Sequence, residues 1–158
     1  MENIKDSYKR LISSKEFNNI GIFSSAFIMT DEKELENSKW QMDFYNKENN
    51  KIITYLMKDK IEVLKNDEIF KDETTNINEI DLNNLNFKLE NCLNIGKESL
   101  ERDNETPVKV IIILQKLENL TWNLTYMSTK FNLINLKINA ENGKVIEESI
   151  SPLLNLKK

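Results

Sequence analysis

Apolar residues recur at helical spacing in two stretches of the chain. In residues 4–17, one helical face carries Ile4, Tyr8, Leu11 and Ile12. In residues 82–102, the apolar stripe comprises Leu82, Leu85, Leu89, Cys92 or Leu93, Gly96 and Leu100. Asp81 precedes this second stretch as a favoured N-cap residue, and Asp103, Asn104 and Pro107 end it. The pattern predicts one amphipathic helix in each half of the chain.

Short apolar or alternating segments predict the strands. They span residues 22–30, 39–46, 52–57, 60–64, 108–115, 121–128, 133–140 and 144–150. The segments 22–30 and 108–115 are apolar on both faces, which is typical of a central strand covered on both sides. In 22–30, simple alternation assigns Phe23, Phe27 and Met29 to one face, and Ile22, Ala26 and Ile28 to the other. Asn142-Gly143 predicts a type I′ hairpin turn before the last strand.

The two tryptophans stand in matching places in the two halves. Trp40 and Trp122 each begin an alternating strand that follows a helix and an apolar strand. Self-similarity of this kind indicates a supersecondary unit used twice. The expected fold class is α+β, with two tandem repeats of one helix packed on an antiparallel sheet of three or four strands. The expected domains are residues 1–65, an acidic linker at 66–81, and residues 82–158.

The second half resembles the PepSY domain family over residues 85–150. The resemblance is carried by Trp122-Asn123-Leu124-Thr125-Tyr126 and by the run Leu136-Lys137-Ile138-Asn139-Ala140-Glu141-Asn142-Gly143-Lys144-Val145-Ile146. The chain has Asn139 and Asn142 where that family most often has Asp and Thr. The first half keeps the Trp40 strand but lacks the Gly hairpin. The resemblance implies a helix against an antiparallel sheet, and a role in binding or restraining peptidases and other proteins. The paired arrangement is also similar to beta-lactamase inhibitory protein, in which a concave sheet grips its partner.

Composition narrows the possible chemistry. The chain has 158 residues, no histidine and a net charge of −4. A negative chain lacks the surface that neutralises nucleic-acid phosphates, so nucleic-acid binding is not expected. Histidine is the usual general base in catalysis and a usual ligand in zinc sites, so its absence disfavours both. Cys92 falls within a helical apolar pattern and is expected to be a buried core residue. We therefore predict no enzyme activity, no catalytic residues and no cofactor.

An acidic loop and a pair of glutamates are the remaining charged features. Residues 31–36 read Asp-Glu-Lys-Glu-Leu-Glu, which fits a short solvated helical turn. A calcium loop would need glycine and regular ligand spacing, which this segment lacks. Glu147-Glu148 is interpreted as part of a solvated face. The sequence predicts no metal site.

One sheet face emerges as the candidate partner surface. The tryptophans point inward on their strands and are expected to be core residues rather than binding anchors. Residues of opposite alternation form a mixed polar and apolar face: Tyr45, Ile111, Ile113, Asn123, Thr125, Met127, Asn135 and Lys137. Exposed mixed patches of this kind mark partner surfaces. The alternative is that the sheets of the two halves merge or pack on each other.

The expected function is non-enzymatic binding of another protein or peptide through this face, as an inhibitor or modulator of the PepSY type. A toxin-neutralising immunity protein and a secretion-chaperone-like homodimer are the alternatives. No apolar run is long enough to span a membrane; the longest, Val108 to Leu114, is interrupted by Lys109. The expected location is cytoplasmic if Met1 is the native start, and extracytoplasmic if a leader or anchor has been removed.

Overall fold

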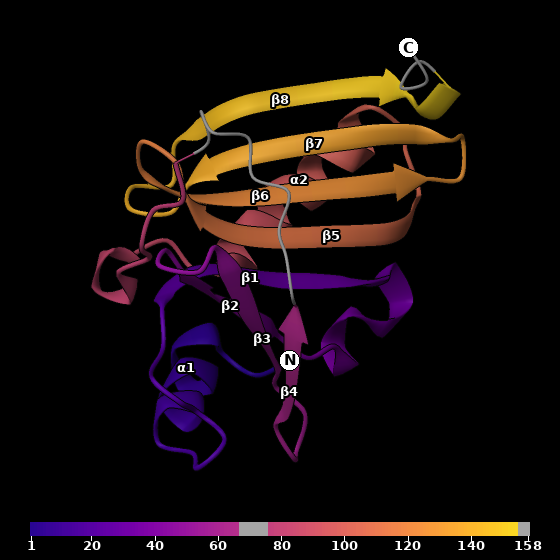
Figure 1. Ribbon diagram of the computed structural model, residues 1–158. Coiled ribbons are helices and arrows are strands. Elements are labelled where there is room, and N and C mark those ends of the chain that lie inside the picture. Colours follow the sequence, from indigo (N-terminus) through magenta and orange to yellow (C-terminus); the bar gives the residue numbers. More distant parts are fainter. Residues whose placement is uncertain (67–75, 155–158) are drawn as a thin grey trace.

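The strands of both halves join in one antiparallel sheet. The computed structural model describes residues 1–66 and 76–154, except the side chains of residues 65 and 66. Its eight-stranded sheet has the order β4-β3-β2-β1-β5-β6-β7-β8 (Figure 1). The strands are β1 (Ile22–Asp31), β2 (Gln41–Asn46), β3 (Lys51–Leu56), β4 (Glu62–Asn66), β5 (Pro107–Lys116), β6 (Leu120–Ser128), β7 (Asn132–Asn139) and β8 (Val145–Pro152).

The predicted fold class of two tandem helix-on-sheet repeats is wrong. Each half does supply a run of four strands ordered outward from the centre, but β1 and β5 pair with each other over seven residue pairs from Ser25–Gln115 to Asp31–Lys109. This junction makes one continuous sheet in place of two sheets. The physical reason is that β1 and β5 each present backbone hydrogen-bonding groups along a free edge, which pairing satisfies.

The described residues form two α-helices, α1 (Ile4–Ile12) and α2 (Leu89–Arg102), both shorter than predicted. The 3₁₀ helix η2 (Leu82–Asn84) precedes α2, and Asp81 caps η2 through the Asn83 N–H. Three asparagines at positions 83, 84 and 86 disfavour a continuous helix there. Instead, the N–H groups of Asn86 and Phe87 both donate to the Ala140 carbonyl. The acidic loop forms a second 3₁₀ helix, η1 (Glu32–Asn37), which agrees with a short helical turn.

The last hairpin turns differently from the prediction. Its loop runs from Ala140 to Lys144, and Asn139 closes it by accepting from the N–H groups of Glu141 and Asn142. In this loop only Gly143 has a positive φ, at 79°, so a two-residue type I′ turn is excluded. A Cβ at Gly143 would lie 2.5 Å from the Phe87 ring. Both the positive φ and the lack of space for a side chain therefore favour glycine at this position. Part of the predicted linker at 66–81, residues 67–75, lies outside the described residues.

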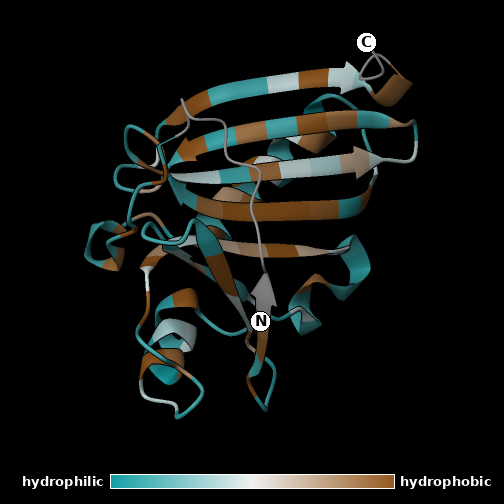
Figure 2. Ribbon diagram, in the orientation of Figure 1, coloured by the Kyte–Doolittle hydropathy of each residue, from teal (hydrophilic) through white to brown (hydrophobic). Residues whose placement is uncertain are grey.

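Both helices cover the same face of the sheet, and the core lies beneath them. Tyr8 of α1 stacks near Phe23 and Phe44, while α2 contacts β6 and β7. Figure 2 shows the middle of β5 as the most continuously hydrophobic strand segment of the sheet. Its inward residues Val110, Ile112 and Leu114 are fully buried. Both tryptophans are buried on this face as well, so the prediction that they are core residues is confirmed.

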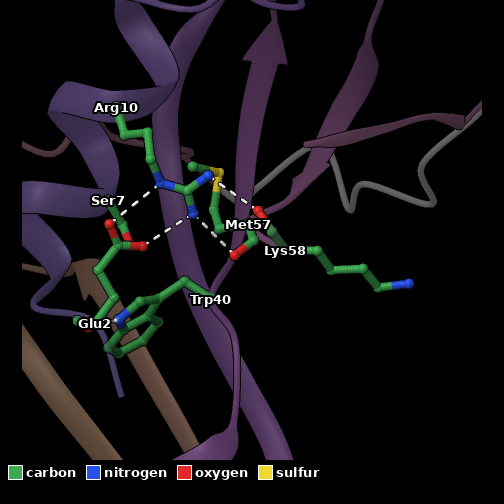
Figure 3. A network of polar contacts seen from close by, with 6 residues as sticks. All are labelled: Glu2, Ser7, Arg10, Trp40, Met57 and Lys58. Atoms are coloured by element: carbon green, nitrogen blue, oxygen red, sulfur yellow. Dashed lines mark hydrogen bonds and ion pairs between the residues drawn. The ribbon is translucent and has the colours of Figure 1, made fainter. Parts of the chain in front are cut away.

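A single arginine ties α1 to the sheet. The Arg10 guanidinium donates to both carboxylate oxygens of Glu2 and to the backbone carbonyls of Met57 and Lys58 (Figure 3). Ser7 adds a 2.6 Å hydrogen bond to the same carboxylate. Arg10 lowers the pKa of Glu2 and Glu2 raises the pKa of Arg10, chiefly through their mutual hydrogen bonds. The network fixes the start of the chain against the loop that follows β3.

Candidate functional site

The helix-free face of the sheet carries an apolar stripe along the β1–β5 junction. The stripe consists of Phe27 and Met29 from β1 and of Ile111 and Ile113 from β5, and we refer to these four residues as the seam patch. Register pairs Phe27 with Ile113 and Met29 with Ile111, which places all four side chains on one face. Met29 is 63% exposed, although it lies within a ten-residue strand at the centre of the sheet.

Seven of the eight predicted site residues lie side by side on β5, β6 and β7 of this face. One row across β5, β6 and β7 holds Ile111, Thr125 and Asn135, and the next row holds Ile113, Asn123 and Lys137. Met127 follows on β6, opposite Lys109. All seven are half-buried. The seven side chains therefore lie on the same face and are partly exposed to solvent, as a docking surface requires.

Tyr45 does not belong to this surface. It lies near the end of β2 opposite Ile22, beyond the last pair of β1 with β5, and only 4% of it is exposed. Its hydroxyl donates to Asn50 Oδ1 at 2.8 Å within the β2–β3 hairpin. Tyr45 thus supports the hairpin rather than the seam patch.

Sequence reasoning missed the contribution of β1. Alternation put Phe23, Phe27 and Met29 on one face, but the register shifts between Phe23 and Ser25. This bulge turns Phe23 toward the helices, where it is buried, and leaves Phe27 and Met29 on the helix-free face. The consecutive small polar residues Ser24 and Ser25 were the available signal for an irregularity within an otherwise apolar strand.

Polar side chains frame the seam patch on both sides. The Asn135 amide donates to Asn123 Oδ1 at 2.7 Å and to Thr125 Oγ1 at 2.8 Å. On the other side, Asp43 of β2 accepts from Thr54 at 2.7 Å and from Ser25 at 3.1 Å. These bonds hold the frame in a fixed geometry. An apolar centre with a polar rim is the usual anatomy of a protein interface.

The outer strand β8 has features that disfavour pairing with a further strand. Its register shifts between Lys137 and Ile138 of β7, which leaves Ile146 as a bulged residue. Glu147 and Glu148 stand in the middle of the strand and Pro152 ends it. Bulges, charges and proline are the devices by which natural sheets block edge pairing. This edge is a poorer docking element than the face.

The thiol of Cys92 is buried and protonated, so it is not a nucleophile on either face of the sheet. It is fully buried in α2, and burial raises the pKa of its thiol to about 12. The thiol is therefore protonated at neutral pH, whereas the thiolate is the reactive species. Within the described ranges, His, Cys, Asp and Glu side chains form no cluster of three or more that could hold a metal ion.

Comparison with known proteins bears on the fold alone. No protein-family profile matches the chain, and no curated protein does. The resemblance to PepSY domains thus stays a prediction. No helix within residues 1–66 and 76–154 is long and apolar enough to cross a membrane. The chain is similar in structure to a crystallised "putative lipoprotein" of Clostridium difficile 630, with a TM-score of 0.58 and 13% sequence identity, over 94% of this chain and 93% of that one.

Proposed function

We propose that this protein is a non-enzymatic binding protein that engages another protein through the seam patch and its polar frame. The exposure of Met29, 63% in the middle of a central strand, is the observation that carries the proposal. Removal of an apolar side chain there from water by a partner, beside Ile111, lowers the free energy and favours binding. Methionine also adapts its shape to a partner at small cost.

The charge of the chain narrows the class of partner. The net charge is −4, so a basic partner is favoured electrostatically and its association is accelerated. A basic peptidase or toxin domain would fit both this charge and the predicted inhibitor or immunity role. The continuous eight-stranded sheet supplies a broad surface for such a domain.

A matched pair of variants tests the proposal. Met29→Lys places a charge in the seam patch, and Ile12→Lys makes the same kind of change at an exposed residue of α1 on the other side of the sheet. Both positions are exposed, so both variants are expected to fold. A partner captured by the wild type and by Ile12→Lys, then purified, should bind Met29→Lys at least tenfold more weakly in calorimetry. Equal affinity for Met29→Lys would contradict the proposal.

Light scattering decides whether that partner is a second copy. A dimer of the wild type that Met29→Lys converts to a folded monomer would support the chaperone-like homodimer instead. A monomeric wild type that still captures its partner supports binding of a different protein.

The description of the Clostridium difficile protein as a lipoprotein favours the extracytoplasmic of the two expected locations. Fractionation of cells that produce the full gene product tests that location.

A further inference from the structure

A concave site lies on the side of the sheet opposite the seam patch, where α1 and α2 both begin. It is a cavity of about 280 Å³, close to the volume of nine waters in the liquid. Its apolar lining comes from buried residues, each less than a tenth exposed: Ile4, Trp40, Leu85, Leu89 and Trp122. Largely apolar cavities with a few polar groups at the mouth are the usual form of small-molecule sites.

The back wall of the cavity is rigid and carries no free donor. The Trp40 indole N–H donates to the Glu2 carbonyl at 2.9 Å, and the Trp122 indole N–H donates to the Phe87 carbonyl at 2.9 Å. Their ring centroids lie 6.1 Å apart. Because both polar edges are engaged and at most 2% of either residue is exposed, only a small, apolar part of the rings borders the cavity, and it is held in place in advance. A preorganised wall of this kind lowers the entropy lost on binding.

The mouth of the cavity has an excess of positive charge. Lys5, Lys88, Glu2 and Glu90 border it, but the Glu2 carboxylate is already paired with Arg10, 2.9 Å away (Figure 3). In the part of the chain that the structure describes, neither lysine forms an ion pair. Two lysines against Glu90 leave a net positive mouth. An anionic group on a ligand is thus favoured, and a cationic group is disfavoured.

We propose that this cavity binds a small carboxylate with an aromatic or aliphatic body. The apolar body lies toward Trp40 and Trp122, and the carboxylate lies at the mouth between Lys5 and Lys88. Charge-assisted hydrogen bonds from the two ammonium groups fix its orientation. The cavity volume limits the body to about the size of one aromatic ring with a short side chain.

Intrinsic fluorescence gives a direct readout, because the chain's two tryptophans both line the cavity. The probes are phenylacetate, the neutral 2-phenylethanol and the cationic 2-phenylethylamine. For ligands of this size, ligand efficiency predicts a Kd near 1 mM for phenylacetate. We expect 2-phenylethanol to bind several-fold more weakly and 2-phenylethylamine more weakly still.

Three variants separate the cavity from its charges. The double variant Lys5→Gln with Lys88→Gln should weaken phenylacetate by about tenfold and leave 2-phenylethanol unchanged. Leu85→Phe fills the cavity and should remove binding of both probes. Met29→Lys lies across the sheet and should change neither, so failure of this inference is distinguishable from failure of the sheet-face proposal. No fluorescence response of the folded wild type up to about 20 mM phenylacetate, well above the Kd expected for its size, would overturn the inference. So would equal affinity for all three probes.

Discussion

The rings of Trp40 and Trp122 meet beneath the junction of the two halves, with centroids 6.1 Å apart and planes inclined by 36°. Each indole N–H donates to the carbonyl of a residue two positions before an α-helix: Glu2 before α1 at Ile4, and Phe87 before α2 at Leu89. Trp40, just before β2, and Trp122, in β6, therefore position the starts of both helices by the same interaction. The contact between the rings then joins the two arrangements.

Replacing Trp122 should be among the most damaging changes in the chain. Its side chain is fully buried, so Trp122→Ala creates a large cavity and removes the donor that holds the Phe87 carbonyl. We expect the free energy of unfolding to fall by roughly 3–5 kcal/mol, measured by urea denaturation. An unchanged midpoint would show that the ring contributes nothing to the core.

The contact between the tryptophans should be measurable as a coupling. In a double-mutant cycle of Trp40→Leu and Trp122→Leu, the two losses of stability should differ from additivity by about 0.5–1.5 kcal/mol, the range for aromatic pairs. The same cycle with Trp122→Leu and the exposed, distant Ile12→Ala serves as the control and should be additive. Additivity in both cycles would show that the two halves are not coupled through these rings.

Much of the secondary structure could be predicted because alternation reports directly which residues face a core. Strands β5 and β6, for example, were placed to within a residue at each end. The helices were harder, since periodicity alone cannot show that Asn83, Asn84 and Asn86 prefer other backbone bonds. The sequence left open whether the sheets of the two halves merge, and the hydrophobic pattern alone could not decide it. An apolar strand such as 108–115 reads the same whether its edge neighbour is local or comes from the other half.

The candidate site shows the same limit. Residues on β5, β6 and β7 were assigned correctly to one face because their registers are regular there. Met29 was missed because its contribution depends on the bulge at Ser24 and on the pairing of β1 with β5. Both are properties of the assembled sheet. Tyr45 was misplaced because alternation gives the face of a residue but not its position along the sheet.

Acid should remove the contribution of the Arg10–Glu2 pair to stability. Arg10 holds the pKa of Glu2 below its ordinary value of 4.5. The pair therefore stabilises the fold fully above about pH 5 and is lost as the pH falls through the lowered pKa of the folded state. Both side chains are about one-third exposed, so we expect Arg10→Met to cost only roughly 1–2 kcal/mol at neutral pH.

The pH dependence distinguishes this pair from other charges on α1. The stability difference between the wild type and Arg10→Met, measured by thermal melting at each pH, should shrink as the pH is lowered below the pKa of Glu2 in the folded state. Lys9→Met removes the same charge from an exposed position of α1 and should change stability by less than about 0.5 kcal/mol. A difference for Arg10→Met that is constant with pH would show that the guanidinium acts only through its bonds to Met57 and Lys58.

Cys92 should be chemically silent in the folded protein. Burial raises the pKa of its thiol to about 12, and Glu90 adds to the shift. At about pH 8 the thiolate fraction is therefore negligible, and iodoacetamide should label the chain only after unfolding. The rate of labelling in increasing urea should track the unfolded fraction. Rapid labelling of the native protein would show that α2 opens away from β6 and β7.

Gly96 should be irreplaceable for a steric reason rather than a conformational one. It lies within α2, where alanine is normally preferred by about 1 kcal/mol. A Cβ there would stand 2.3 Å from the Tyr126 hydroxyl and 2.9 Å from its ring, and Tyr126 is itself buried. We expect Gly96→Ala to destabilise the protein by roughly 1–3 kcal/mol, measured by urea denaturation.

Asn94→Ala, at an exposed position of the same helix, should be neutral or stabilising. Adding Tyr126→Phe should recover part of the loss, because it removes the closest atom. If Gly96→Ala is instead as stable as Asn94→Ala, α2 does not pack on β6 as closely as this glycine implies.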